Sequence, residues 1–74
     1  MMSAADMDAL DASTGSAFDR MWVEMMIEHH QGAVEMAQTE LSDGQNADAK
    51  ALAQTIISTQ TAEIATLTKL LPTL

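Results

Sequence analysis

Residues 21–36 read MWVEMMIEHHQGAVEM and hold both histidines, the single tryptophan and four of the seven methionines of a chain without cysteine. Apolar side chains recur in this stretch three and four residues apart, which is the spacing of one side of an α-helix. Methionine at that spacing fills adaptable cores, and methionine together with histidine also binds soft metal ions. The stretch therefore predicts a helix and leaves two interpretations of its methionines and histidines open.

The apolar side of this helix is wide. At about 100° per residue, two apolar stripes lie next to each other, with His30 and Ala37 between them. The first stripe contains Phe18, Trp22, Met25, His29, Gly32, Ala33 and Met36, flanked by Met21 and Met26. The second contains Val23, Ile27, Val34 and Leu41. Together they cover more than half of the circumference, which is more than an ordinary surface helix buries.

Helical segments also flank this stretch. A short helix is predicted over about residues 3–11, with Ser3 and Asp6 as a capping pair. The helix that carries the histidines is predicted over about residues 17–41, with Ser16 as its N-cap.

A turn follows in which Gly44 suits a left-handed C-terminal cap and Asn46 suits the next N-cap. A third helix is predicted over about residues 47–71, and Pro72 ends it. No alternation of apolar residues predicts a strand. We therefore expect one all-α domain over residues 1–74, built as an antiparallel helical hairpin with a short N-terminal helix.

The third helix has too narrow an apolar face to cover both stripes of the second. Its apolar residues on one face are Leu52, Ala53, Ile56, Ile57, Ile64, Leu67, Leu70 and Leu71. That face covers one stripe, so the other must find a different surface. We expect a second copy of the chain, giving a homodimer in which two hairpins form a four-helix bundle.

Gln60 and Glu63 interrupt the apolar face of the third helix. Buried polar groups need partners, so each has one of two environments. In one, their head groups reach water at the edge of the hairpin. In the other, they face the histidines and fix an imidazole tautomer. The sequence leaves both open.

Composition limits the function. A 74-residue chain has a marginal core of its own. The net charge of −8 argues against nucleic-acid binding and against binding to anionic membrane surfaces. No run of apolar residues is long enough to span a bilayer, and no signal peptide is visible, so the compartment cannot be inferred from the composition.

The histidines and methionines are the candidate ligands. Adjacent histidines on a helix point about 100° apart, so His29 and His30 do not readily chelate one ion together. Each has a methionine one turn earlier, Met25 before His29 and Met26 before His30. Thioether and imidazole donors without thiolate favour Cu(I) or the similar Ag(I). The predicted ligands are His29, Met25 and Met36, followed by His30, Met26 and Met21.

Two other interpretations compete with the metal site. A methionine stripe is more often packing than a metal site, and here it would be a dimer core with no metal, in a structural or protein-interaction module. We expect no enzyme, because the sequence has no thiol nucleophile and no phosphate-binding loop. A di-iron site needs Glu-x-x-His pairs, whereas Met26 and Ile27 lie three residues before the histidines.

Residues 25–37 resemble the signature of the DUF 305 family, which is Met-Ile-x-His-His-x-x-Ala-x-x-Met-Ala. Residues 18–22 and 49–64 are similar to the family pattern too, so the resemblance covers nearly the whole chain. It implies a ferritin-like helical bundle, an exported bacterial protein of the periplasm or cell envelope, and binding of Cu(I) or Ag(I) by methionine and histidine. Two positions depart from the pattern, because Glu28 replaces a usual proline and Leu67 a common methionine.

Overall fold

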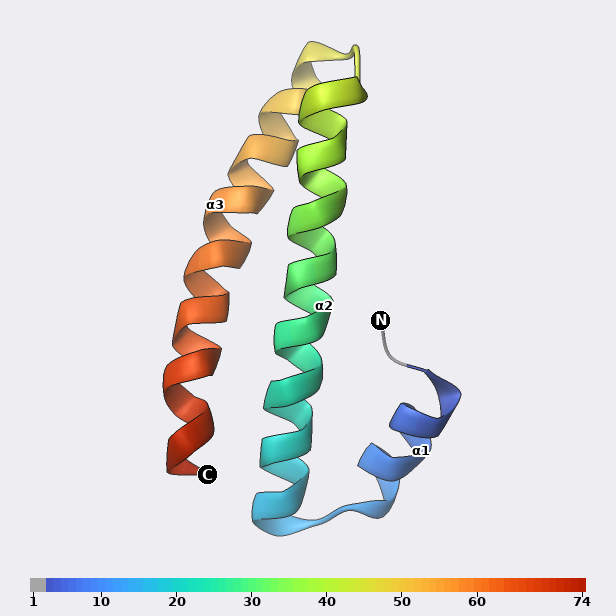
Figure 1. Cartoon of the computed structure of the whole chain (residues 1–74), viewed down its shortest axis with the longest axis vertical. Coiled ribbons are helices and arrows are strands. Elements are labelled where there is room, and N and C mark those ends of the chain that lie inside the picture. The colour runs from blue at the N-terminus through green and yellow to red at the C-terminus, as the bar shows by residue number, and fades with distance from the viewer. Residues whose placement is uncertain (1–2) are drawn as a thin grey trace.

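A computed structural model describes residues 3–74, which form three α-helices and a short 3₁₀ turn (Figure 1). The elements are α1 (Ala4–Ala12), α2 (Gly15–Asp43), α3 (Ala47–Leu70) and η1 (Leu71–Thr73). No strand occurs among these residues, so the all-α prediction is confirmed. Met1 and Met2, with which the predicted domain begins, lie outside the described residues.

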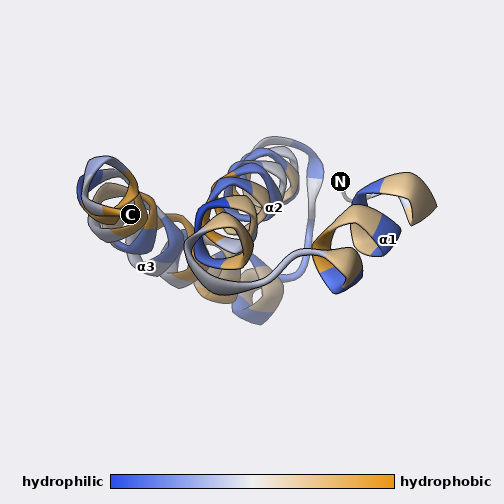
Figure 2. Cartoon of the chain, turned by 90° about the horizontal axis from the view of Figure 1, so that it is seen from below, coloured by the Kyte–Doolittle hydropathy of each residue, from blue (hydrophilic) through white to orange (hydrophobic). Residues whose placement is uncertain are grey.

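The helices form a single layer. α2 and α3 run antiparallel, and α1 lies beside the N-terminal half of α2 on the side away from α3 (Figures 1 and 2). The layer measures 44 × 26 × 13 Å between Cα extremes, and its radius of gyration is 14.8 Å. A compact domain of this length has a radius of gyration of about 11 Å. The protein is therefore flat and extended for its size.

The predicted capping pair at the start of α1 is present. The backbone N–H of Asp6 donates to the Ser3 hydroxyl over 3.1 Å, and the backbone N–H of Ser3 donates to the Asp6 carboxylate over 3.2 Å. Two backbone donors that the helix leaves unpaired are thereby satisfied. The short helix begins one residue later than predicted and ends at Ala12.

The start of α2 differs from the prediction. Ser16 is not the N-cap, because the helix already begins at Gly15. Gly15 has a φ of 59°, a left-handed value that glycine adopts without a Cβ penalty. Thr14 occupies the cap position, and its side chain makes no capping hydrogen bond. The conformational freedom of glycine, rather than a capping hydroxyl, sets this boundary.

In the turn between α2 and α3, the prediction for Gly44 is wrong and the prediction for Asn46 is confirmed. Gly44 is not left-handed, since its φ of −74° and ψ of 163° are extended. A Cβ atom at Gly44 would overlap the side chain of Glu40, so close approach explains the small residue. Asn46 is the N-cap of α3, and its side chain accepts from the N–H of Ala49 over 2.8 Å.

The contact between α2 and α3 follows a seven-residue spacing. On α2 the buried residues are Val23, His30 and Ala37, and on α3 they are Ala53 and Leu67. This spacing keeps one narrow seam of each helix against the other. His30, which is 6% exposed, is the one buried polar residue of the part of the chain described. The seam is the second predicted stripe of α2 together with the residues between the stripes.

The first stripe of α2 is largely exposed, although Met25 is half-buried beside α1. Among residues 3–74, the large apolar side chains that stay exposed are Met7, Phe18, Trp22, Met36, Leu52 and Leu70. Leu52 and Leu70 show that α2 covers the apolar face of α3 only in part. No side chain of the described residues is completely enclosed. The hairpin therefore has a seam but no thick core.

Candidate functional site

The six predicted metal ligands lie in three different surroundings. Met26 and His30 line a pocket between α2 and α3, Met21 and Met25 line a pocket beside α1, and His29 and Met36 line an open recess on α2. The structure therefore does not gather all six around one point.

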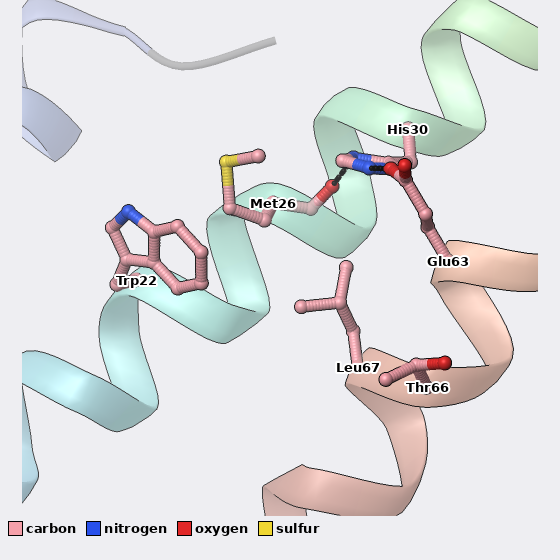
Figure 3. A pocket seen from close by; sticks show the side chains of 6 residues that line it. All are labelled: Trp22, Met26, His30, Glu63, Thr66 and Leu67. Carbon is pink, nitrogen blue, oxygen red and sulfur yellow. Dashed lines mark hydrogen bonds and ion pairs between the residues drawn. The ribbon is translucent and has the colours of Figure 1, made fainter. Parts of the chain in front are cut away.

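His30 is held at both ring nitrogens (Figure 3). Its Nδ1 atom lies 2.7 Å from the backbone carbonyl oxygen of Met26, one turn earlier in α2. Its Nε2 atom meets the Oε2 atom of Glu63, which reaches across from α3. Of the two environments open for Glu63, the structure therefore shows the contact with a histidine.

The Met26 carbonyl fixes the tautomer of His30. A carbonyl oxygen can only accept, so Nδ1 carries a hydrogen and donates it. One further proton then lies between Nε2 and the Glu63 carboxyl group, on one atom or the other. In either arrangement the Nε2 lone pair is engaged. His30 is thus not available to a metal ion while Glu63 remains in place.

The pocket next to this pair has a volume of about 240 Å³. It is lined by Trp22, Met26, His30, Glu63, Thr66 and Leu67 (Figure 3). Apart from the His30–Glu63 pair and the Thr66 hydroxyl, its walls are apolar. Sequence reasoning missed the Met26 carbonyl and Thr66. The four-residue separation of Met26 and His30 was a usable signal for the first, because a helical side chain leans over the preceding turn.

His29 has a different environment. It is exposed, and its ring meets the edge of the His30 ring with centroids 6.4 Å apart and planes at 71°. Neither of its nitrogens makes a hydrogen bond within residues 3–74. Met25 lies one turn before it, half-buried, and Met36 lies two turns after it, 71% exposed.

Two hollows adjoin His29 and Met25. The recess of about 330 Å³ on α2 is lined by His29, Gly32, Ala33, Glu35 and Met36. The pocket of about 250 Å³ beside α1 is lined by Asp6, Ala9, Met21, Glu24, Met25 and Glu28. Carboxylates thus border the methionines and His29 on both sides. These carboxylates favour a cation over an anion at this face.

Residues 3–74 contain no group of three or more His, Asp or Glu side chains placed to share one metal ion. The remaining donors on the open face are the thioethers of Met25 and Met36 and the imidazole of His29. These are donors that suit soft ions.

The family model described as "Domain of unknown function (DUF305)" matches residues 1–71. The chain belongs to the DUF305 family. No curated protein and no solved structure matches it. In the described residues of this DUF305 protein, none of the helices has the length and apolar character needed to span a membrane.

Proposed function

We propose that this DUF305 protein binds Cu(I) or Ag(I) outside the cytoplasm and buffers or carries the ion. His29, Met25 and Met36 are the leading ligands, on the face of α2 that α3 leaves open, with Met25 at its edge beside α1. One observation carries the proposal. An exposed imidazole that makes no hydrogen bond to residues 3–74 lies on the same helix face as two thioethers. No catalytic role is part of it.

The donor set fits a soft monovalent ion. Met25 and His29 are four residues apart, so a thioether and an imidazole nitrogen lie on one side of the helix. Thioether sulfur binds Cu(I) well and harder ions poorly. The net charge of −8 and the carboxylates around the two hollows raise the local concentration of cations. A chain without cysteine also suits an oxidising compartment.

The other three predicted ligands have lesser roles in the proposal. His30 is engaged by Glu63 and the Met26 carbonyl, so it positions α2 against α3. Met26 faces the pocket next to that pair, and Met21 faces α1. They become ligands only if the hairpin opens.

The proposal includes a homodimer. The accessible surface of the chain is 5062 Å². A compact monomer of 7.9 kDa exposes about 4,400 Å². The excess approaches the roughly 800 Å² that each partner buries in a stable protein interface. Since domains are built from at least two packed layers, a second hairpin on the open face would supply the missing layer and a four-helix, ferritin-like bundle.

A dimer module without metal is the alternative. The exposed apolar side chains of Phe18, Trp22 and Met36 favour it, because patches of this kind mark interaction surfaces. The alternative predicts the same dimer and no effect of metal. The two functions therefore differ in one measurable property, which is the binding of metal.

A silver titration separates them. Ag(I) needs no reductant, and Trp22 lies close enough to Met25 for its fluorescence to report binding. We expect a saturable change in the wild type and at least a tenfold weaker affinity in His29→Ala. His30→Ala is the matched control and should keep the affinity within about threefold. No saturable binding in the wild type, or equal affinity in His29→Ala, would overturn the proposal.

A further inference from the structure

We infer that two copies pack through the open face with their α2 helices antiparallel, so that Met36 of the second copy completes the Met25–His29 pair of the first. The metal part of this inference rests on the proposed function, whereas the packing does not. Each dimer then holds two equivalent sites, and neither copy has a complete one alone. The positions of large and small side chains along α2 favour this arrangement.

Two of the three large exposed apolar side chains of α2 lie symmetrically about His29, and the third, Phe18, lies nearer the N-terminus. Trp22 is seven residues before His29 and Met36 seven residues after it, which is about 10.5 Å along the helix in each direction. Leu52 of α3 lies at the same height along the hairpin as Met36, because both line one hollow of about 330 Å³ between the helices. A two-fold axis across α2 at His29 therefore sets Trp22 of each copy against Met36 of the other.

Large side chains precede His29 on α2, and small ones follow it. Met25 and Met26 precede His29, whereas Gly32 and Ala33 follow it. The antiparallel arrangement places Met25 opposite Gly32 of the second copy and Met26 opposite Ala33. A Cβ atom added at Gly32 would meet open space, which confirms that room exists there. The recess of about 330 Å³ on α2 is thus filled by methionines of the second copy.

Two α2 helices that pack in parallel do not place large side chains opposite small ones. This arrangement sets methionine against methionine and glycine against glycine, and it leaves the recess empty. Since voids in a packed interface cost free energy, the antiparallel arrangement is favoured.

Side-chain direction then brings three ligands together. Helical side chains lean toward the N-terminus of their own helix. His29 therefore leans toward Met25, and Met36 of the antiparallel copy leans toward the same level from the opposite direction. The result is one imidazole and two thioethers, of which one thioether comes from the second copy. Carbonyl or carboxylate ligands are not required for Cu(I) or Ag(I).

The packing can be tested without metal, because the chain has no cysteine of its own. The variants Trp22→Cys and Met36→Cys are prepared separately, mixed in equal amounts and equilibrated with a glutathione redox buffer and a chelator. A disulfide forms only between residues whose Cα atoms lie within about 7 Å of each other. Because the proposed packing sets these two positions face to face, we expect the disulfide between Trp22→Cys and Met36→Cys chains to predominate. Gln38→Cys, exposed on the opposite side of α2, is the matched control and should form no excess of disulfide with Trp22→Cys.

Two other patterns would overturn the packing. Parallel stacking predicts disulfides between identical Trp22→Cys chains. Stacking of α2 on α3 of the second copy predicts a disulfide between Trp22→Cys and Leu70→Cys chains. A chain that stays monomeric in sedimentation at micromolar concentration would overturn it as well.

The shared site has its own test by complementation. His29→Ala lacks the imidazole, and Met36→Leu lacks one thioether at nearly constant volume. If all ligands of a site come from one chain, a mixture of the two variants has no complete site. If Met36 is contributed by the second copy, each mixed dimer has one complete site, and high-affinity Ag(I) binding returns to about a quarter of the wild-type capacity in a random mixture.

The failures of the two proposals are distinguishable. Absence of silver binding in the wild type contradicts the proposed function and leaves the disulfide pattern to decide the packing. Wild-type binding without complementation contradicts the shared site and leaves the metal function standing. The expected disulfide together with complementation supports both.

Discussion

Glu63 of α3 meets the Nε2 atom of His30 of α2 in the middle of the hairpin seam, while the Met26 carbonyl holds the opposite nitrogen. The imidazole is buried, whereas the Glu63 side chain is 58% exposed. A shift of α3 by one turn would leave His30 without its acceptor. The pair therefore specifies how the two helices align, which is a role that single buried polar groups have in coiled coils.

Removal of Glu63 should weaken the hairpin. We expect Glu63→Ala to lower the free energy of unfolding by about 1 kcal/mol, because buried His30 loses a hydrogen-bond partner and solvent weakens part of the effect at the exposed Glu63 side chain. Urea unfolding at a fixed protein concentration measures this. Gln38→Ala, exposed on the side of α2 opposite the open face, is the control and should change stability by less than about 0.5 kcal/mol. Equal effects of the two substitutions would contradict the role of the pair.

Substitutions of the two adjacent histidines should have different effects, because His30 supports the fold and His29 is a proposed metal ligand. His30→Ala removes a buried side chain and its hydrogen bonds, so we expect a loss of about 2 kcal/mol, or roughly 10 °C in Tm for a domain of this size. His29→Ala removes an exposed side chain and should leave the metal-free Tm nearly unchanged. Thermal melts followed by circular dichroism test this. A larger loss in His29→Ala than in His30→Ala would refute the assignment.

Gly32→Ala should strengthen the helix and weaken the dimer. Alanine is favoured over glycine inside a helix by about 1 kcal/mol, and the added Cβ meets nothing within the chain. It does, however, occupy space that the proposed interface gives to Met25 of the second copy. Helix content in the dilute monomer should rise while the dimer dissociation constant increases. Gln31→Ala, on the opposite side of α2, should leave the dissociation constant unchanged.

Salt should favour the dimer. Each chain carries a net charge of −8, so two copies repel each other over distances that salt screens. We expect the dimer dissociation constant, measured by sedimentation, to fall as sodium chloride is raised from 20 to 500 mM. A dissociation constant that rises with salt would indicate an interface held by ion pairs rather than by apolar side chains.

Most of the fold could be predicted from the periodicity of the sequence, because three amphipathic segments and two short breaks leave few alternatives. The ends of α2 could not. Ser16 and Gly44 have the usual composition of caps, but Gly15 enters the helix with a positive φ and Gly44 is required by the nearby Glu40. Such boundaries depend on backbone angles and close approach, which composition does not specify.

The candidate site was predictable only in part. The pattern placed Glu63 on the apolar face of α3, yet whether it reached a histidine depends on how the turn aligns the two helices. His29 and His30 are equivalent as neighbours in the sequence. They become different only when α3 covers one and not the other.

The seam and the open face are separate strips of one helix. The residues that align α2 with α3 are Val23, His30 and Ala37, and none of them is among the exposed side chains of the open face. Substitutions on the open face can therefore change what the protein binds without altering how it folds. A hairpin of this kind is a scaffold on which ligand selectivity can be evolved or engineered one residue at a time.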